Sequence, residues 1–188
     1  MYRKLDTQRI LSAGIPDIAT VYGGVRGRTM SSRHQNYAWD IISEAGIHTI
    51  IDLREDGTKS SLPEKCRQHG MTYFHYPVDN KCNSIDRMVT MFDDLCRHID
   101  AGNFYIACAM GLHRTDIALC TYWVFYAADK GMEPPQIIGY SEESGHDTCK
   151  INRVLNRIYS YLTEKDGEEP MPAPEFKRRK EIIKQSSK

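Results

Sequence analysis

The stretch Cys108-Ala-Met-Gly-Leu-His-Arg114-Thr115 decides how the rest of this chain is interpreted. The short apolar run 104–107 precedes it and predicts a buried strand, and the apolar-rich segment 116–128 after it predicts a helix. A cysteine therefore ends a strand, five residues form a loop, and an arginine opens a helix. Backbone amides converge in such a loop, and the helix N-terminus adds partial positive charge, so the loop is suited to bind an anion.

Several residues of this stretch suit chemistry on a phosphate. Gly111 permits a tight turn, and the guanidinium of Arg114 grips two oxygens at once while keeping its charge. Cys108 lies in the same positive field, so we expect it to ionise and act as a nucleophile, with Thr115 donating a hydrogen bond to the sulfur. The alternative is a buried cysteine beside a helix-capping arginine. The pattern favours a thiolate that faces a bound phosphate.

The spacing Cys-x5-Arg followed by Thr resembles the active-site signature of the cysteine-based protein tyrosine phosphatases, and of the dual-specificity phosphatases among them. The strand, the helix and the glycine at the fourth position strengthen this resemblance, which covers about residues 20–162. It implies a protein phosphatase that hydrolyses phosphotyrosine, with phosphoserine and phosphothreonine as further substrates, through a phosphocysteine intermediate. It implies catalytic roles for Cys108, Arg114 and Thr115 and no cofactor or metal ion. The residues that it implies for substrate binding are Ala109, Met110, Gly111, Leu112, His113 and Arg114.

The resemblance also requires a general acid, which in these phosphatases is an aspartate on a loop upstream of the cysteine, after a strand that ends near a proline. Tyr76-Pro77-Val78-Asp79 fits that description, and Asp79 precedes the cysteine by 108 − 79 = 29 residues. Many dual-specificity members place the aspartate three residues after the proline, where this chain has Asn80. Asp86 is the second candidate, although it lies within a predicted helix. The alternative for Asp79 is a carboxylate that orders a turn.

Two positions depart from the family pattern. The family usually has histidine immediately before the cysteine, where it helps to organise the loop, and this chain has Ala107. Asp116 follows the signature threonine, where the family often has a small residue or proline. A carboxylate in a first helical turn is favourable to the helix dipole, but it would repel a bound phosphate unless it is turned away.

Other basic side chains are potential contacts for the anion. His113 is interpreted either as an additional phosphate contact or as a surface imidazole. Arg26 and Arg28 are expected on a loop after the first strand, where they either add to the rim of the site or lie in a solvated turn. Asp52-Leu-Arg54 resembles a common run of the family, and we expect Arg54 to brace neighbouring loops rather than to contact substrate.

Other functions for the same loop remain open at this point. An inositol phosphate or phosphoinositide phosphatase would use the same chemistry, although such relatives tend to carry lysines in the loop and this chain has none there. A catalytically weak module that only binds phosphate is the other alternative, because of Ala107 and of the shifted position of the candidate acid Asp79. The position of the cysteine and an upstream acid argue against low-molecular-weight phosphatases and arsenate reductases. The expected partner is a phosphorylated protein or a small phosphomonoester, and the oligomeric state is not predicted.

Strands and helices are predicted in alternation. The segments 20–25, 47–54, 71–76 and 104–107 have strand patterns, and helical patterns cover 33–45, 63–70, 85–101, 116–128 and 151–162. This order predicts an α/β fold with a central, mostly parallel sheet of about four to five strands flanked by helices, as in the dual-specificity phosphatases. In such sheets ligands bind at the carboxyl edge of the strands, where Cys108 falls.

Length and composition add weaker expectations. The 188 residues fit a phosphatase-like domain over 1–165, followed by a linker and a basic tail over 166–188. The tail is expected to include a short helix that is solvated, or else binds an acidic partner. The formal net charge of +0 gives no general attraction for nucleic acid or membranes. Six scattered cysteines without a CxxC pair, no signal peptide and no apolar segment of membrane-spanning length predict a cytoplasmic protein.

Overall fold

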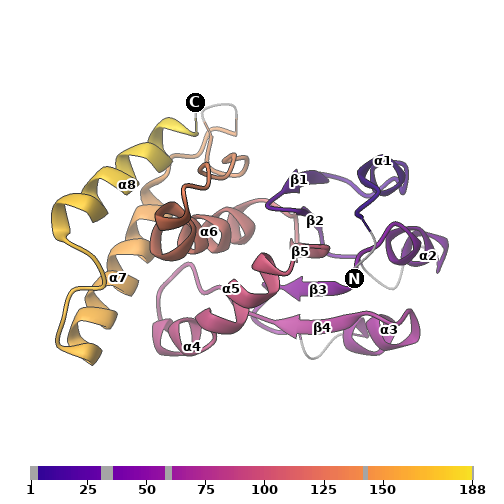
Figure 1. Ribbon diagram of the computed structural model, residues 1–188, viewed down its shortest axis with the longest axis horizontal. Coiled ribbons are helices and arrows are strands. Elements are labelled where there is room, and N and C mark those ends of the chain that lie inside the picture. Colours follow the sequence, from indigo (N-terminus) through magenta and orange to yellow (C-terminus); the bar gives the residue numbers. More distant parts are fainter. Residues whose placement is uncertain (1–3, 31–35, 58–60, 142–143, 188) are drawn as a thin grey trace. The chain divides into compact units, whose positions relative to one another are not determined.

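The computed structural model describes residues 4–30, 36–57, 61–141 and 144–187 (Figure 1). The chain forms two compact units, which are described in turn. The first comprises Met1–Pro77 and Asp94–Thr115, and the second comprises Val78–Asp93 and Asp116–Lys188. The loop that begins at Cys108 lies in the first unit.

The first unit contains a five-stranded sheet with the order β1-β2-β5-β3-β4. Its strands are β1 (Ala19–Val21), β2 (Gly24–Arg28), β3 (Thr49–Asp52), β4 (Thr72–His75) and β5 (Phe104–Cys108). The β1–β2 pair is antiparallel, whereas β2–β5, β5–β3 and β3–β4 are parallel. The predicted α/β fold with a mostly parallel sheet is therefore confirmed. All residues of the central strand β5 are buried, as its apolar sequence indicated.

The first predicted strand is wrong in detail, because residues 20–25 form a hairpin and not one strand. Tyr22 has a φ of +48° and Gly23 a φ of +76°. Two consecutive residues in the left-handed region make a tight turn whose twist suits a hairpin. The chain reverses there, and the residues after Gly23 become β2, next to the central strand.

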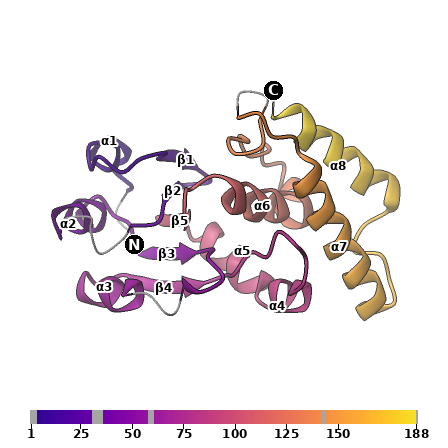
Figure 2. The same ribbon diagram turned by 180° about the vertical axis from the view of Figure 1, so that it is seen from behind.

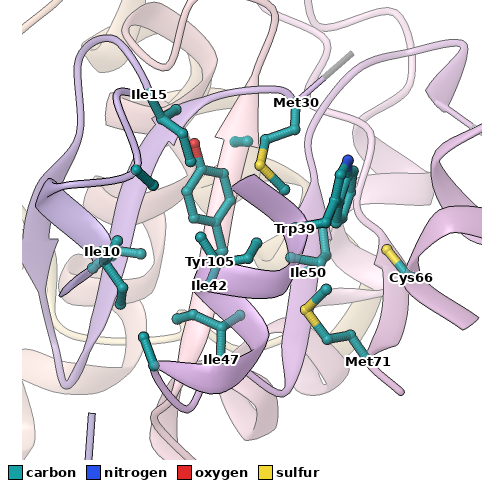
Figure 3. Close-up of a cluster of buried hydrophobic side chains, with 14 of the residues drawn as sticks. Ile10, Ile15, Met30, Trp39, Ile42, Ile47, Ile50, Cys66, Met71 and Tyr105 are labelled. Carbon is teal, nitrogen blue, oxygen red and sulfur yellow. The ribbon is translucent and has the colours of Figure 1, made fainter. Parts of the chain in front are cut away.

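Helices and a hydrophobic cluster cover one face of this sheet (Figure 3). Side chains alternate along β5, so Tyr105 and Ala107 belong to the cluster and Ile106 and Cys108 lie on the opposite face. The helices of the first unit are α1 (Thr7–Leu11), α2 (Asn36–Glu44), α3 (Leu62–Gln68) and most of α5 (Phe92–Asp100). The cluster takes Ile10 from α1, Trp39 and Ile42 from α2, and Leu62 and Cys66 from α3. The predicted helix over 33–45 is described from Asn36 onward, since 31–35 lie outside the described residues.

The predicted helix over 85–101 is two helices. The first, α4 (Ile85–Thr90), ends at Met91, whose φ of −94° and ψ of 0° are not helical, and α5 begins at Phe92. The hydroxyl of Thr90 donates a hydrogen bond to the carbonyl of Asp86 (2.7 Å). Such a bond from a threonine to the carbonyl four residues earlier often bends a helix. The apolar stripe of the sequence continues across the break, which is why the periodicity did not reveal it.

The second unit is helical. Besides α4, it contains most of α6 (His113–Tyr122), the π-helical turn η2 (Trp123–Ala127), the short η3 (Ala128–Lys130), α7 (Cys149–Asp166) and α8 (Ala173–Gln185). Figures 1 and 2 show α7 and α8 side by side, and the rings of Tyr159 and Phe176 stack between them with centroids 4.3 Å apart. None of the described helices is long and apolar enough to cross a membrane.

The basic tail forms the expected helix, α8, but that helix is not solvated all round. Phe176, Arg179 and Ile183 are buried. The guanidinium of Arg179 donates to the carbonyl of Val124 in η2 (2.5 Å) and to Glu175 (2.7 Å), and it also pairs with Asp129. The prediction of a solvated tail helix is therefore wrong, because one face of α8 belongs to the packed core of the second unit. The independence of 1–165 as a domain stays a prediction.

Candidate functional site

The candidate site begins where the central strand ends. Cys108 is the last residue of β5 and is paired in parallel register with Arg28 of β2, while Ala107 is paired with Asp52 of β3. Parallel strands on both sides place the cysteine at the carboxyl edge of the sheet, the edge at which α/β folds bind ligands. Cys108 is 4% exposed. The predicted location of the loop, at the carboxyl ends of the strands, is confirmed.

The carbonyl of Cys108 anchors the loop at its start. It accepts hydrogen bonds from the backbone N–H of Thr29 (2.9 Å), from the Thr29 hydroxyl (2.9 Å) and from the backbone N–H of Gly111 (3.2 Å). The first two bonds tie the end of β5 to the end of β2, and the third closes a turn over residues 108–111. The backbone that carries the sulfur is therefore held on both sides.

Gly111 has the tight conformation that its position in the sequence predicted, and it also makes a close approach that the sequence did not predict. Its φ is +73°, in the region that glycine adopts most easily. A Cβ atom there would lie 2.3 Å from the carbonyl carbon of Gly27 and 2.7 Å from the amide nitrogen of Arg28. The loop is thus packed directly against the backbone of β2, and no side chain fits at this position.

The sulfur of Cys108 has a hydroxyl partner. Thr115 Oγ1 donates to Cys108 Sγ over 3.4 Å, and Thr115 is 0% exposed. The hydrogen bond expected from the sequence is present. It connects the end of β5 with the first turn of α6, across the whole loop.

Arg114 has a partner and an unused donor. Its Nη2 donates to Glu55 Oε1 over 3.1 Å, and the side chain of Glu55 is itself 59% exposed. The Nε atom of Arg114 is buried and has no hydrogen-bond partner among the described residues. A buried N–H group without a partner is costly, and an oxyanion in the loop would satisfy it.

The remaining loop residues differ in exposure. Ala109 and Met110 are exposed, the latter at 47%, and Leu112 and His113 are half-buried. The exposed edge of the loop is therefore apolar. His113 begins α6, so its backbone N–H belongs to the helix N-terminus that the sequence indicated.

The structure corrects the placement of two arginines. Arg26 and Arg28 lie in β2 and not on a loop. Arg26 is 2% exposed, and its Nη2 donates to the carbonyl oxygens of Gly111 (3.0 Å) and Leu112 (3.3 Å). Arg28 pairs with Asp17 over 3.4 Å. Arg26 therefore lies neither at the rim of the site nor in a solvated turn, because the hairpin places it in the buried strand β2.

The two departures from the family pattern have structural explanations. Ala107 is 1% exposed and belongs to the same hydrophobic cluster as Trp39 and Ile50, where a histidine would place a polar ring among apolar side chains. The carboxylate of Asp116 is committed to the second unit. It is 0% exposed and accepts hydrogen bonds from the backbone N–H groups of residues 138, 139 and 140 at 3.2, 2.6 and 3.2 Å.

Arg54 has the bracing role that the sequence predicted. Its Nε and Nη2 donate to the buried carboxylate of Asp52 (3.0 and 2.7 Å), and the carbonyl of Arg54 contacts Nε2 of His75 over 2.5 Å. The Tyr73 hydroxyl also donates to Asp52 (3.0 Å). The hydrogen bonds to Asp52 raise the pKa of Arg54, and burial together with the Asp52 charge raises the pKa of Tyr73. This cluster links the ends of β3 and β4.

The candidate acids lie in the second unit. Asp79 is 7% exposed, and its carboxylate accepts backbone hydrogen bonds from Lys81 (2.8 Å), Asn83 (2.6 Å) and Ser84 (3.1 Å). It therefore orders the turn before α4, as one of the two interpretations expected. Asp86 is exposed in the first turn of α4. The assignment of either residue as general acid stays a prediction. Among the described residues, no group of His, Cys, Asp and Glu is arranged to hold a metal ion.

Comparison with known proteins bears on the fold. No protein-family model matches the chain, and no curated protein matches it. A crystal structure of a candidate phosphatase from Shewanella putrefaciens CN-32 does match, with a TM-score of 0.57, 15% identity, and coverage of 83% of this chain and 98% of that chain. This chain shares the fold of that protein.

A second crystal structure of a candidate phosphatase from the same organism has a TM-score of 0.51 and 13% identity, and covers 98% of this chain and 97% of that chain. This match extends beyond residues 20–162, to which the sequence motifs had limited the resemblance. The expected α/β fold is thereby confirmed as one that this chain shares with both candidate phosphatases.

Proposed function

We propose that the protein is a cysteine-dependent phosphoric monoester hydrolase that dephosphorylates phosphotyrosine, and also phosphoserine and phosphothreonine, through a phosphocysteine intermediate. One observation carries this proposal. A cysteine sulfur that accepts a hydrogen bond from Thr115 lies at the start of a loop that is closed over glycine, and the loop ends at an arginine with a buried, unused N–H donor. A thiolate nucleophile and a set of oxyanion donors are the two requirements of phosphoryl transfer to sulfur.

The reaction has two displacements. In the first, Cys108 Sγ attacks phosphorus, an S–P bond forms, and the ester P–O bond breaks. The leaving oxygen takes a proton from a general acid, for which we propose Asp79. Backbone amides of the loop other than that of Gly111, which donates to the Cys108 carbonyl, and the guanidinium of Arg114 bind the non-bridging oxygens and stabilise their charge.

In the second displacement, water attacks phosphorus, the S–P bond breaks and inorganic phosphate leaves. The sulfur departs as a thiolate, and the hydrogen bond from Thr115 (3.4 Å) stabilises the negative charge that returns to it. The same acid, now deprotonated, takes the proton from the attacking water. The cycle uses no cofactor.

The surface of the loop favours a phosphorylated protein over an inositol phosphate. Met110 is 47% exposed, Ala109 is exposed and Leu112 is half-buried, so the exposed edge of the loop is apolar. An apolar edge suits the ring of phosphotyrosine, whereas a polyphosphorylated inositol requires several more cations. We propose a cytoplasmic location, which the six free cysteines support.

The central test compares Cys108→Ser with Cys149→Ser, an exposed cysteine outside the loop. Hydrolysis of p-nitrophenyl phosphate and of a phosphotyrosine peptide is measured for both variants and the parent. We expect Cys108→Ser to lose turnover while it still binds vanadate, and Cys149→Ser to match the parent. Equal rates in the parent and Cys108→Ser would show that the loop does not catalyse the reaction. Phosphate binding without turnover in the parent would identify the non-catalytic alternative.

A second pair of variants tests the general acid. Asp79→Asn is expected to lower kcat and to remove the basic limb of the pH–rate profile, because the acid must be protonated to donate. The loss is expected to be larger with phosphoserine than with p-nitrophenyl phosphate, whose leaving group needs less protonation. Asp86→Asn is the matched control. If Asp86→Asn gives these results and Asp79→Asn does not, the assignment of Asp79 is wrong.

A further inference from the structure

A buried arginine of β2 lies behind the anion-binding loop. Arg26 is paired with Ile106 of β5, so its side chain lies on the face of the sheet that also carries Cys108. It is 2% exposed, which is exceptional for an arginine. Burial of a guanidinium in a protein interior is unfavourable unless strong acceptors compensate, so the partners of Arg26 indicate what it stabilises.

Two of these partners are carbonyl groups of the loop. Nη2 donates to the oxygen of Gly111 (3.0 Å) and to the oxygen of Leu112 (3.3 Å). A trans peptide group is planar, and its C=O and N–H point in opposite directions. Because the two carbonyls are directed toward Arg26, the N–H groups of Leu112 and His113 are directed away from it.

These orientations complete the division of the loop into an anchored part and an anion-binding part. The N–H of Gly111 is already used, because it donates to the carbonyl of Cys108 (3.2 Å). The next two amides are the ones that Arg26 orients. A cation that binds a carbonyl also polarises the peptide group, which strengthens its N–H as a donor.

The side chain of Ala107, the residue before the cysteine, cannot donate hydrogen bonds to the loop carbonyls as Arg26 does. Ala107 has no hydrogen-bonding side chain, and it belongs to the hydrophobic cluster on the opposite face of the sheet. The contacts to the carbonyls of Gly111 and Leu112 come from β2.

We infer that Arg26 is a positioning residue of the proposed reaction, which fixes the peptide groups after Gly111 and Leu112 so that two amides are presented to the phosphate. The inference rests on the proposed function, since it assumes that the anion bound by the loop is a phosphate. Arg26 does not touch the substrate and acts through the loop backbone.

The test compares Arg26→Met and Arg26→Lys with Arg28→Met. Arg28 lies in the same strand, and its guanidinium pairs with Asp17 instead of the loop. Affinity for inorganic phosphate is measured by calorimetry, and the amide resonances of Leu112 and His113 are followed by NMR during the phosphate titration. Catalysis is followed through kcat and KM for p-nitrophenyl phosphate.

We expect Arg26→Met to lower kcat for p-nitrophenyl phosphate about 10²-fold, as removal of an oxyanion donor does, to weaken phosphate binding, and to abolish the amide shifts of Leu112 and His113. Arg26→Lys keeps a cation but loses the forked guanidinium contact, so we expect its phosphate affinity and kcat to lie between those of Arg26→Met and those of the parent. Arg28→Met is expected to bind phosphate as the parent does. If Arg26→Met does not fold, Arg26→Lys carries the test.

Parent-like phosphate affinity and amide shifts in the Arg26 variants, even with a lower Tm, would reduce Arg26 to a purely structural residue and overturn the inference. The proposed function would survive that result. It would fall instead if the parent bound no phosphate, or if Cys108→Ser turned over substrate as fast as the parent.

Discussion

Gly111→Ala is the sharpest single test of the loop geometry, since two independent costs apply at that position. A residue with a Cβ in the left-handed region loses about 1–2 kcal/mol. In addition, the new Cβ would lie 2.3 Å from the Gly27 carbonyl carbon, whereas carbon atoms prefer about 3.5–4.0 Å. Overpacking against atoms that cannot rotate away costs about 1–3 kcal/mol. If the loop stays in place, the two costs together destabilise the fold by about 2–5 kcal/mol.

The loop has another way to accommodate the methyl group, which is to move away from β2 by about 1 Å. Stability would then fall less, but a displacement of that size in a catalytic loop costs about 10²-fold in kcat/KM. Gly111→Ala is therefore expected to lose mainly stability if the loop stays in place, and mainly activity if the loop moves.

Gly70→Ala is the matched control, because Gly70 has a φ of +69° and a Cβ there would meet nothing within 4 Å. It isolates the backbone cost of about 1–2 kcal/mol. Urea unfolding, phosphate affinity and hydrolysis of p-nitrophenyl phosphate are measured for both variants. If Gly111→Ala matched Gly70→Ala in all three, the packing of the loop against β2 described above would be refuted.

Four further predictions concern residues outside the loop. Asp116→Asn is expected to destabilise the protein by about 2–3 kcal/mol in urea, because the buried carboxylate that serves the N–H groups of 138–140 is lost; an unchanged midpoint would contradict this. Burial raises the pKa of Cys66 to about 12, so iodoacetamide at neutral pH should label this thiol only after unfolding, and labelling in the native protein would show that it is exposed. Hydrogen bonds from two arginines of α8 lower the pKa of Glu175 from 4.5 to about 2, so the small stability from this pairing is present above pH 4.5 and is lost as the pH falls toward 2; Tm measured over that range should depend less on pH in Glu175→Gln. Phe176→Ala should cost about 3–4 kcal/mol, whereas a truly solvated tail helix would give almost no change.

The strand, loop and helix around Cys108 were predictable because each depends on local sequence. The apolar run, the glycine and the arginine that opens a helix all lie within one short segment of the sequence. The parallel sheet followed from the alternation of strands and helices, and the edge that carries Cys108 followed from the sheet. The hydrogen bond from Thr115 to the sulfur was predictable because it joins residues of one short motif.

The role of Arg26 was not predictable from local sequence. It depends on the pairing of β2 with β5, which joins residues 25–28 with residues 105–108. A one-residue change in that register would turn Arg26 to the opposite face. The only local signal was the Tyr22-Gly23 turn, which would have placed Arg26 in a strand had it been interpreted as a hairpin.

The break at Met91 and the packed tail were missed for a different reason. An apolar stripe at helical spacing continues through a single non-helical residue, so periodicity alone cannot reveal such a break. In α8 only Phe176, Ile182 and Ile183 lie among many charged residues, and the buried Arg179 looks like another surface cation in the sequence. Its partners in η2 and η3 come from a part of the chain about fifty residues earlier.

The packing of Gly111 on β2 makes the loop geometry depend on completion of the β2–β5 pairing in the first unit. Strand β2 emerges early in synthesis and the loop that packs on it follows much later, so a nascent chain that ends before residue 115 lacks the complete loop. If the loop binds phosphate as proposed, added phosphate stabilises the molecule in which β5 is paired with β2 over partly paired forms by RT ln(1 + [L]/Kd).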